Sequence, residues 1–158
     1  MRGVRGVAPR TRAVHMIDGE RGRNDLSSST SAEAIDLERV ICRLADMDTI
    51  GARGFTLGGG DWPLRGIVVR VREEVRGYIN RCPHAGHPLN LRPNHFLTPD
   101  RSLLLCASHG ALFDKLTGLC IAGPCPGQSL RAIPLKVADG FVMWGDEVDL
   151  AALVEMGN

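Results

Sequence analysis

Short apolar stretches separated by turn residues recur through most of the chain from residue 39 onward. Several of them alternate apolar and polar side chains with a period of two, which is typical of half-buried strands. Many short strands joined by Gly- and Pro-containing turns predict an all-β domain of stacked antiparallel sheets. We expect strands at residues 39–44, 65–72, 75–81, 103–106, 111–115, 119–122, 133–137 and 141–144.

The turn signals between these strands predict two hairpins. Residues 73–74 form a polar pair between two predicted strands, and residues 139–140 are the Asp-Gly pair typical of a two-residue hairpin turn. The glycine run at residues 58–60 predicts a flexible turn. It lacks the strand-to-helix context of a phosphate-binding loop, so no nucleotide site is predicted there. Helical spacing is expected only in the tail, at residues 148–156.

Composition divides the chain into three segments. Residues 1–36 contain few large apolar side chains and are expected to form a disordered, basic and Ser-rich arm. Residues 37–148 form the predicted domain, and residues 149–158 a tail or short helix. The first 23 residues contain six Arg and two acidic residues. The chain from Asp139 onward has five acidic residues and no Lys or Arg. The net charge of +1 gives no indication of nucleic-acid binding.

The cysteine pattern and the apolar runs bear on the compartment. No run approaches the ~20 apolar residues of a membrane span. No basic stretch followed by an apolar segment marks a secretory signal. Cys42, Cys120 and Cys125 are an odd, irregular set and do not indicate a disulfide framework. We therefore expect a protein without a membrane span in the reducing cytoplasm.

Two short motifs carry the chemistry of the chain. Cys82 and His84 form the first and Cys106 and His109 the second, with 21 residues between them. Two thiolates and two imidazoles suit a tetrahedral zinc, or a [2Fe–2S] cluster with two His ligands on one iron. Zinc sites of this composition usually pair like ligands within one motif, whereas each motif here mixes them. The spacing favours the cluster, with zinc as the alternative.

The residues around both motifs resemble the Rieske-type [2Fe–2S] proteins, in the branch of small Rieske ferredoxins. The resemblance covers roughly residues 37–145 and implies a Rieske-like fold with the cluster-binding part at about residues 80–127. It is carried by residues 80–89, 106–114, 117–118 and 122–127. In that family the last of these segments is a Pro-containing loop that covers the cluster, which places Pro124 beside it here.

The resemblance also implies a role for each ligand. Cys82 and Cys106 would hold one iron, and His84 and His109 the outer iron, with their far nitrogens near solvent. The same four residues are then both the metal ligands and the cofactor-binding set. Gly110 would let the backbone of the second loop approach the cluster closely.

The neighbouring positions bear on the reduction potential. High-potential members of the family bridge two extra Cys, and His87 and Ser108 occupy those positions here, so this bridge is not expected. Those members also carry hydroxyl donors where this chain has Ala111 and Phe113. Fewer hydrogen bonds to sulfur predict a potential toward the low end of the Rieske range, about −150 mV. His87 could also couple a proton or help dock a partner, although a solvated loop side chain is the simpler interpretation.

The predicted function is single-electron transfer, from a flavoprotein reductase to an oxygenase or similar acceptor, by a redox carrier without a substrate site of its own. A Rieske oxygenase subunit would need a further iron held by two His and a carboxylate, yet no His follows His109. One alternative is the small subunit of a nitrite-reductase-type or multicomponent oxygenase complex. The other is a zinc-stabilised structural module.

Overall fold

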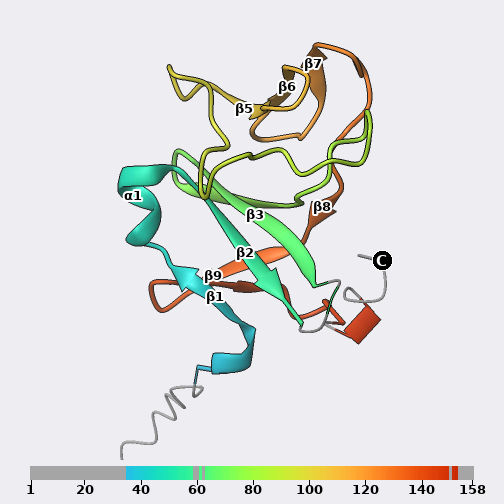
Figure 1. Ribbon diagram of the computed structural model, residues 1–158. Coiled ribbons are helices and arrows are strands. Elements are labelled where there is room, and N and C mark those ends of the chain that lie inside the picture. The colour runs from blue at the N-terminus through green and yellow to red at the C-terminus, as the bar shows by residue number, and fades with distance from the viewer. Residues whose placement is uncertain (1–34, 59–60, 62, 150, 153–158) are drawn as a thin grey trace, which may run out of the picture. The chain divides into compact units, whose positions relative to one another are not determined.

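Three antiparallel sheets make up the folded part of the chain (Figure 1). The computed structural model describes residues 35–58, 61, 63–149 and 151–152. The strand orders are β1-β10-β9, β2-β3-β4-β8 and β5-β6-β7. In chain order the elements are the 3-10 turn η1 (Leu37–Arg39), β1 (Val40–Arg43), α1 (Asp46–Ile50), β2 (Ala52–Leu57), β3 (Leu64–Val71), β4 (Glu74–Ile79), β5 (Leu103–Cys106), β6 (Ala111–Asp114), β7 (Cys120–Ala122), β8 (Ala132–Ile133), β9 (Leu135–Ala138) and β10 (Phe141–Trp144). The all-β prediction is confirmed.

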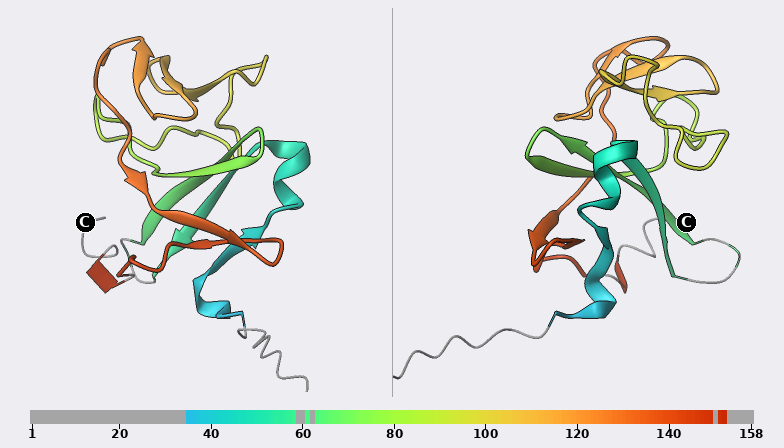
Figure 2. Two further views of the ribbon diagram at one scale, coloured as in Figure 1. Left: turned by 180° about the vertical axis from the view of Figure 1, so that it is seen from behind. Right: turned by 90° about the vertical axis from the view of Figure 1, so that its left-hand side faces the viewer.

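The fold has two parts, which we call the base and the cap. The cap is residues 80–131 and holds the sheet β5-β6-β7 together with the loops that precede, connect and follow its strands. The base is the remainder of the described chain and holds the other two sheets and α1. Figure 2 shows the cap stacked on one end of the base, with the sheet β2-β3-β4-β8 between the cap and the sheet β1-β10-β9.

Strand β3 has a core on each of its faces. Ile67 and Val69 pack with residues of the cap, whereas Val68 packs with residues of β1 and β10. All three side chains are fully buried. Because successive side chains of a strand point to opposite faces, a strand covered on both sides reads as a continuous apolar run. Each buried Val or Ile contributes about 2 kcal/mol, so β3 anchors both parts of the fold.

The two predicted hairpins form, one of them with a shifted turn. Strands β3 and β4 pair up to Val71 opposite Glu74, so the two-residue loop is Arg72 and Glu73, one position earlier than the acidic pair suggests. Arg72 takes a φ of 57° there. Asp139 and Gly140 both have positive φ and join β9 to β10. Positive φ at both central residues is the geometry that Asp-Gly favours.

The predicted strand at residues 133–137 is two strands. Pro134 has no backbone N–H and cannot continue a ladder, and it separates β8 from β9. Strand β8 pairs with β4 and β9 pairs with β10, so the break carries the chain from one sheet of the base to the other.

Sequence reasoning missed α1 and β2. Helix α1 has only five residues and buries Met47, and it ends at Gly51, whose φ is +68°. One turn is too short to show helical periodicity. Strand β2 pairs with β3 along its whole length, although Arg53 and Gly54 interrupt its apolar pattern. A Cβ at Gly54 would lie 3.2 Å from the ring of Phe96, so this strand approaches the cap closely at the glycine.

Three sequence predictions concern residues outside the described part. The segment predicted to be disordered, residues 1–36, lies almost wholly outside it, and so does most of the glycine run at residues 58–60. In the tail only residues 151 and 152 are described beyond residue 149, and both are helical. Among the described residues, no helix has the length and apolar character needed to cross a bilayer.

Candidate metal centre

Two short loops at the top of the cap carry the four candidate ligands. The first follows β4, and its turn is closed by bonds from Cys82 N–H to the His87 carbonyl and from Gly86 N–H to the Cys82 carbonyl, each 2.8 Å. The second joins β5 to β6 and is closed by Gly110 N–H donating to the Cys106 carbonyl at 2.9 Å. Gly86 and Gly110 both have φ above +70°, which glycine adopts without strain.

The two cysteines of these loops lie together in the interior. Cys82 is 2% exposed and Cys106 is 1% exposed, and both belong to the core shared by the cap and β3. Burial raises the pKa of the Cys82 thiol, while the backbone N–H of His84 donates a hydrogen bond to its sulfur and opposes the rise. The neighbouring Cys106 side chain also raises the pKa of the Cys82 thiol. The two motifs therefore bring their sulfur atoms to one shared point.

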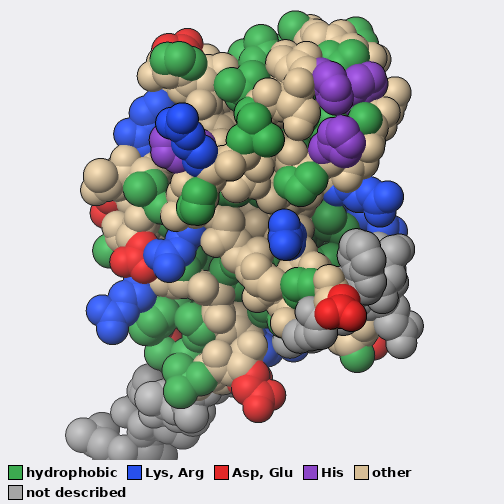
Figure 3. All heavy atoms as spheres, in the orientation of Figure 1, with side chains coloured by type: hydrophobic (Ala, Val, Ile, Leu, Met, Phe, Trp, Pro, Cys, Tyr) green, Lys and Arg blue, Asp and Glu red, His purple; other side chains and the backbone are tan. Residues whose placement is uncertain are grey.

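The histidines form a second group on the surface. The rings of His84 and His109 meet edge to face, with centroids 4.9 Å apart and planes at 85°. His87 stacks on His109, with centroids 5.7 Å apart and planes at 28°. All three residues are exposed. Figure 3 shows histidine side chains gathered near the top of the molecule. His87 therefore belongs to this group, which its place in the sequence alone did not indicate.

The four candidate ligands are thus sorted by type. Each loop gives one side chain to a buried thiol pair and one to an exposed imidazole pair. A two-iron centre with unlike ends requires this arrangement. In the described part of the chain, no three His, Cys, Asp or Glu side chains surround one point closely enough to hold a single metal ion. The donor set fits a [2Fe–2S] group, and the assignment of individual ligands is a proposal taken up below.

A third loop, residues 123–127, follows β7 and packs beside the thiol pair. Cys125 is 1% exposed, and its sulfur lies 3.4 Å from that of Cys120, which is also buried. Burial, together with the neighbouring Cys120 thiol, raises the pKa of Cys125 to about 12. Gly123 has a φ of +103°, and a Cβ on it would lie 2.7 Å from the Cα of Ala111. Only glycine lets this loop lie flat against β6.

The residues next to the thiols supply few donors. Ala111 and Phe113 are fully buried in β6, and neither side chain carries a polar hydrogen. Ser108 is half-buried and Pro124 is exposed. The structure therefore places Ala111 and Phe113 in the core around the thiols. High-potential members of the family have hydroxyl-bearing side chains at these two positions.

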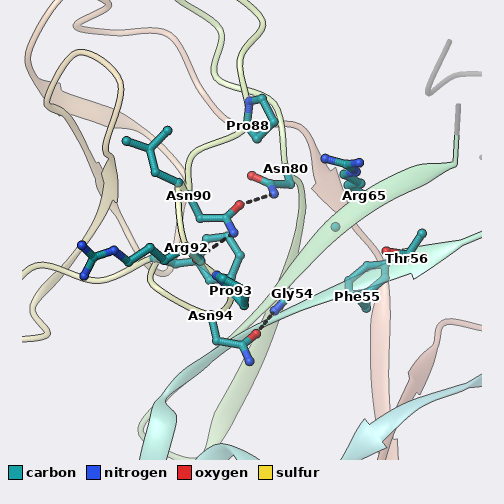
Figure 4. Close-up of a pocket in the computed structure, with 13 residues that line it drawn as sticks. Gly54, Phe55, Thr56, Arg65, Asn80, Pro88, Asn90, Arg92, Pro93 and Asn94 are labelled. Carbon is teal, nitrogen blue, oxygen red and sulfur yellow. Dashed lines mark hydrogen bonds between the residues drawn. The ribbon is translucent and has the colours of Figure 1, made fainter.

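Amide side chains hold the first loop against the base. Figure 4 shows a pocket of about 380 Å³ between this loop and strands β2 and β3. Asn80 donates to Asn90 at 2.8 Å, and the Asn80 oxygen accepts the Leu89 N–H at 2.8 Å. Asn94 accepts the N–H of Gly54 in β2 at 2.9 Å. The two Asn80 bonds lie within the cap and the Asn94 bond joins the cap to β2, so these amides brace the segment that lines the pocket.

Comparison with known proteins identifies the family. The model of the Rieske [2Fe-2S] domain matches residues 38–139, well over half of the chain. No curated protein matches. A Sphingomonas yanoikuyae B1 ferredoxin is 23% identical with a TM-score of 0.51, and the match covers 68% of this chain and 96% of that one. The ferredoxin of carbazole 1,9a-dioxygenase from Nocardioides aromaticivorans IC177 is 23% identical, with a TM-score of 0.53 and coverage of 67% and 94%.

A larger protein shares the same fold over part of its length. The terminal oxygenase of carbazole 1,9a-dioxygenase from Novosphingobium sp. KA1 is 21% identical with a TM-score of 0.55, over 71% of this chain and 31% of that one. At these identities the likeness establishes the fold. The family match and the shared fold confirm the resemblance seen in the sequence: the chain belongs to the Rieske [2Fe–2S] domain family, whose domain binds a [2Fe–2S] cluster.

Proposed function

We propose that this protein carries single electrons between partner proteins, with Cys82 and Cys106 binding the inner end of the cluster and His84 and His109 the outer end. The observation that supports this proposal best is the sorting of the four side chains into a buried thiol pair and an exposed imidazole pair. When bound, the cluster supplies a one-electron redox centre. The thiols hold it inside the core, and the imidazoles present its outer end to solvent.

The surrounding residues fit a low-potential carrier. Ala111 and Phe113 keep the buried end apolar and donate no hydrogen bond, which disfavours extra negative charge near the thiols. The imidazole edges at the surface give an approaching partner a short path for the electron. We expect no reaction at a substrate, because the asparagines that line the pocket beside the first loop are engaged in holding that loop.

We propose a terminal oxygenase or similar enzyme as the acceptor and a flavoprotein reductase as the donor. Ferredoxins with this fold occur in complexes with the oxygenase of carbazole 1,9a-dioxygenase, which motivates the assignment. We also propose a reducing cytoplasmic location. The cysteines outside the two motifs, Cys42, Cys120 and Cys125, are an odd and irregular set that does not indicate a disulfide framework, which supports this location.

Stoichiometric electron transfer tests the proposed function. Holoprotein purified without air is reduced with dithionite, freed of excess reductant and mixed with oxidised cytochrome c in a stopped-flow instrument. We expect one electron to leave each cluster, with the visible absorption returning to that of the oxidised protein. A coloured cluster that cannot be re-oxidised would contradict the carrier function. A colourless protein with stoichiometric zinc would support the structural module instead.

A further inference from the structure

The cap and the base carry opposite net charges, although the whole chain is nearly neutral. The cap contains five cationic and two acidic side chains, a net charge of +3. The described residues of the base contain eight cationic and eleven acidic side chains, a net charge of −3. A bound oxidised cluster leaves this balance unchanged, because the charges of two ferric irons, two sulfides and two thiolates cancel. The positive end of the molecule is therefore the end with the proposed cluster site.

The two carboxylates of the cap are both used locally. Asp100 accepts hydrogen bonds from the hydroxyls of Thr98 and Ser102, at 2.6 and 2.7 Å, and these hold its pKa down to about 2. Asp114 accepts from the backbone and hydroxyl of Thr117, each at 2.8 Å, which lowers its pKa. Both groups hold turns in place, and within the described residues neither forms an ion pair with a cap arginine.

Cations of the base are used differently. Arg53 pairs with Asp46 at 3.0 Å, and Arg70 pairs with Asp48 and Glu73. Arg76 and Lys136 also have carboxylate partners, Glu74 and Asp146. Every ion pair found among the described residues lies in the base. In Figure 3, acidic side chains are seen mainly in the lower half of the molecule, where Lys and Arg also lie, and further Lys or Arg side chains lie just beneath the histidines.

Two of the cap arginines flank the proposed cluster site. Arg81 and Arg131 are exposed and line one pocket of about 320 Å³, together with Cys82 and Gly86 of the first loop. The Arg81 side chain lies along this loop, since a Cβ on Gly86 would be 3.3 Å from Arg81 Nε. The pocket thus places two guanidinium groups beside the loop that carries His84. Guanidinium groups bind carboxylates through paired hydrogen bonds.

We propose that the face formed by Arg81 and Arg131 beside the histidines docks the acidic surface of a redox partner protein, whose carboxylates enter the pocket between the two arginines. This inference rests on the proposed electron-carrier function and names the kind of partner that the same site accepts. The separation of charge between cap and base orients the molecule as it approaches, so that its cluster end meets the partner first. Such steering raises association rates and weakens as salt screens the charges.

Two acceptor proteins of opposite charge test the inference. Reduced holoprotein is mixed with acidic cytochrome b5 or with basic cytochrome c, at ionic strengths from about 10 to about 300 mM, which shortens the screening length severalfold. We expect the rate with cytochrome b5 to fall about tenfold over this range. The dissociation constant of the oxidised pair, measured by calorimetry, should rise in parallel, which gives a readout besides electron transfer.

Matched variants separate the local face from overall charge. R81Q/R131Q should slow electron transfer to cytochrome b5 about tenfold at low salt and lose most of the salt dependence. R43Q removes one exposed cation from β1 of the base and should change the rate less than about twofold. EPR spectra of all variants should match that of the wild type, which shows that the cluster is intact.

Each result distinguishes the docking inference from the function on which it rests. If electrons reach cytochrome c faster than cytochrome b5 at low salt, or if R43Q slows the reaction as much as R81Q/R131Q, the docking inference is overturned and the carrier function stands. If an intact, reduced cluster gives no electron to either acceptor, the carrier function itself fails.

Discussion

The base and the cap of this protein use the same kinds of side chain for different purposes. In the base, strands pair closely, two hairpins have two-residue loops, and four of the eight described cations have carboxylate partners. In the cap, residues 80–102 form one long loop that is held by asparagine amides and main-chain bonds. Four of the five cysteines, and every histidine among the described residues, lie in the cap. The base provides the scaffold, and the cap provides the chemistry.

The difference explains how a small sheet can position four ligands. Strand β4 leads into the first ligand loop, and the second ligand loop joins β5 to β6. Strand β3 packs beneath them with Ile67 and Val69 fully buried. Rigid strands define where each loop begins, so only a few residues per loop need a special conformation. Glycine meets that need at Gly86 and Gly110. Three pairs of variants test the role of the cap, and a fourth change tests the link between cap and base.

The largest contrast is expected between two buried cysteines. C106S removes a proposed ligand and should abolish the visible absorption and EPR signal of the cluster. C42S changes a buried cysteine of β1 and should cost about 1–3 kcal/mol of stability while the full cluster content remains. Iron and sulfide analysis with chemical denaturation measures both. Equal cluster loss in the two variants would show that the cap does not hold the cluster independently of the base core.

Two glycines of the third loop differ in the space around them. G123A places a Cβ 2.7 Å from the backbone of Ala111, so the loop must move away from β6. Overpacking of this kind costs about 1–3 kcal/mol, and we expect the cluster to be lost about tenfold faster in air. G127A also has positive φ, but nothing lies within 4 Å of the new Cβ. Its strain should lower stability by about 1 kcal/mol without accelerating cluster loss. Similar bleaching rates in both variants would exclude packing as the cause.

Hydroxyl groups introduced near the thiols should raise the reduction potential. A111S and F113Y each add one donor in the buried part of β6, where the thiol pair lies. A hydrogen bond that favours the reduced form by about 1 kcal/mol corresponds to about 40 mV for one electron. F55Y makes the same chemical change in β2 of the base and should leave the potential unchanged. EPR-monitored redox titration gives all three values, and an unshifted potential in both cap variants would refute this explanation.

Tyr78 links the base to the cap, and its substitution is expected to have the smallest effect of the four changes. Its hydroxyl in β4 donates to the Lys115 carbonyl of the cap at 2.9 Å, and its ring packs on Gly118. Burial raises the pKa of Tyr78 to about 12. The neutral form is therefore favoured by folding, and this contribution is complete below about pH 10 and is lost as pH rises toward 12.

The Y78F variant tests this link. It should be about 1 kcal/mol less stable at neutral pH because the bond to Lys115 is lost. Its stability should also decline less steeply than that of the wild type between about pH 10 and 12. Urea denaturation across this range measures the difference. Parallel pH curves for the two proteins would mean that the Tyr78 hydroxyl does not titrate with folding.

How much the sequence predicts also differs between the parts. Local patterns predict strands β3 and β4 and the turn at Asp139 and Gly140, because alternation and turn chemistry are properties of neighbouring residues. Strand β2 could not be recognised in this way. Its pattern is interrupted by Arg53 and Gly54, and its place depends on pairing with β3 and on the close approach of Phe96. Pro134 marks the break between β8 and β9 in the sequence, but the apolar residues on both sides of it predict one continuous strand.

In the cap the ligand types could be predicted, but their surroundings could not. The Cys and His spacing indicates the chemistry because the motif residues are close in sequence. The stacking of His87 on His109 joins two different loops, and the contact between the Cys120 and Cys125 thiols joins β7 to the loop that follows it. The opposite charges of the cap and base were also hidden. A net charge of +1 for the chain gives no indication of a +3 cap, whose cations are scattered between Arg81 and Arg131.

The central claim is that one end of the cluster is held by two buried thiols and the other by two exposed imidazoles. Pulsed EPR of the dithionite-reduced protein, purified without air, tests it most directly. The account predicts a reduced signal of low average g with hyperfine couplings from two histidine nitrogens, and the loss of one coupling in H109C if that variant keeps a cluster. A cluster without strongly coupled nitrogen, or a colourless protein that holds one zinc, would contradict it.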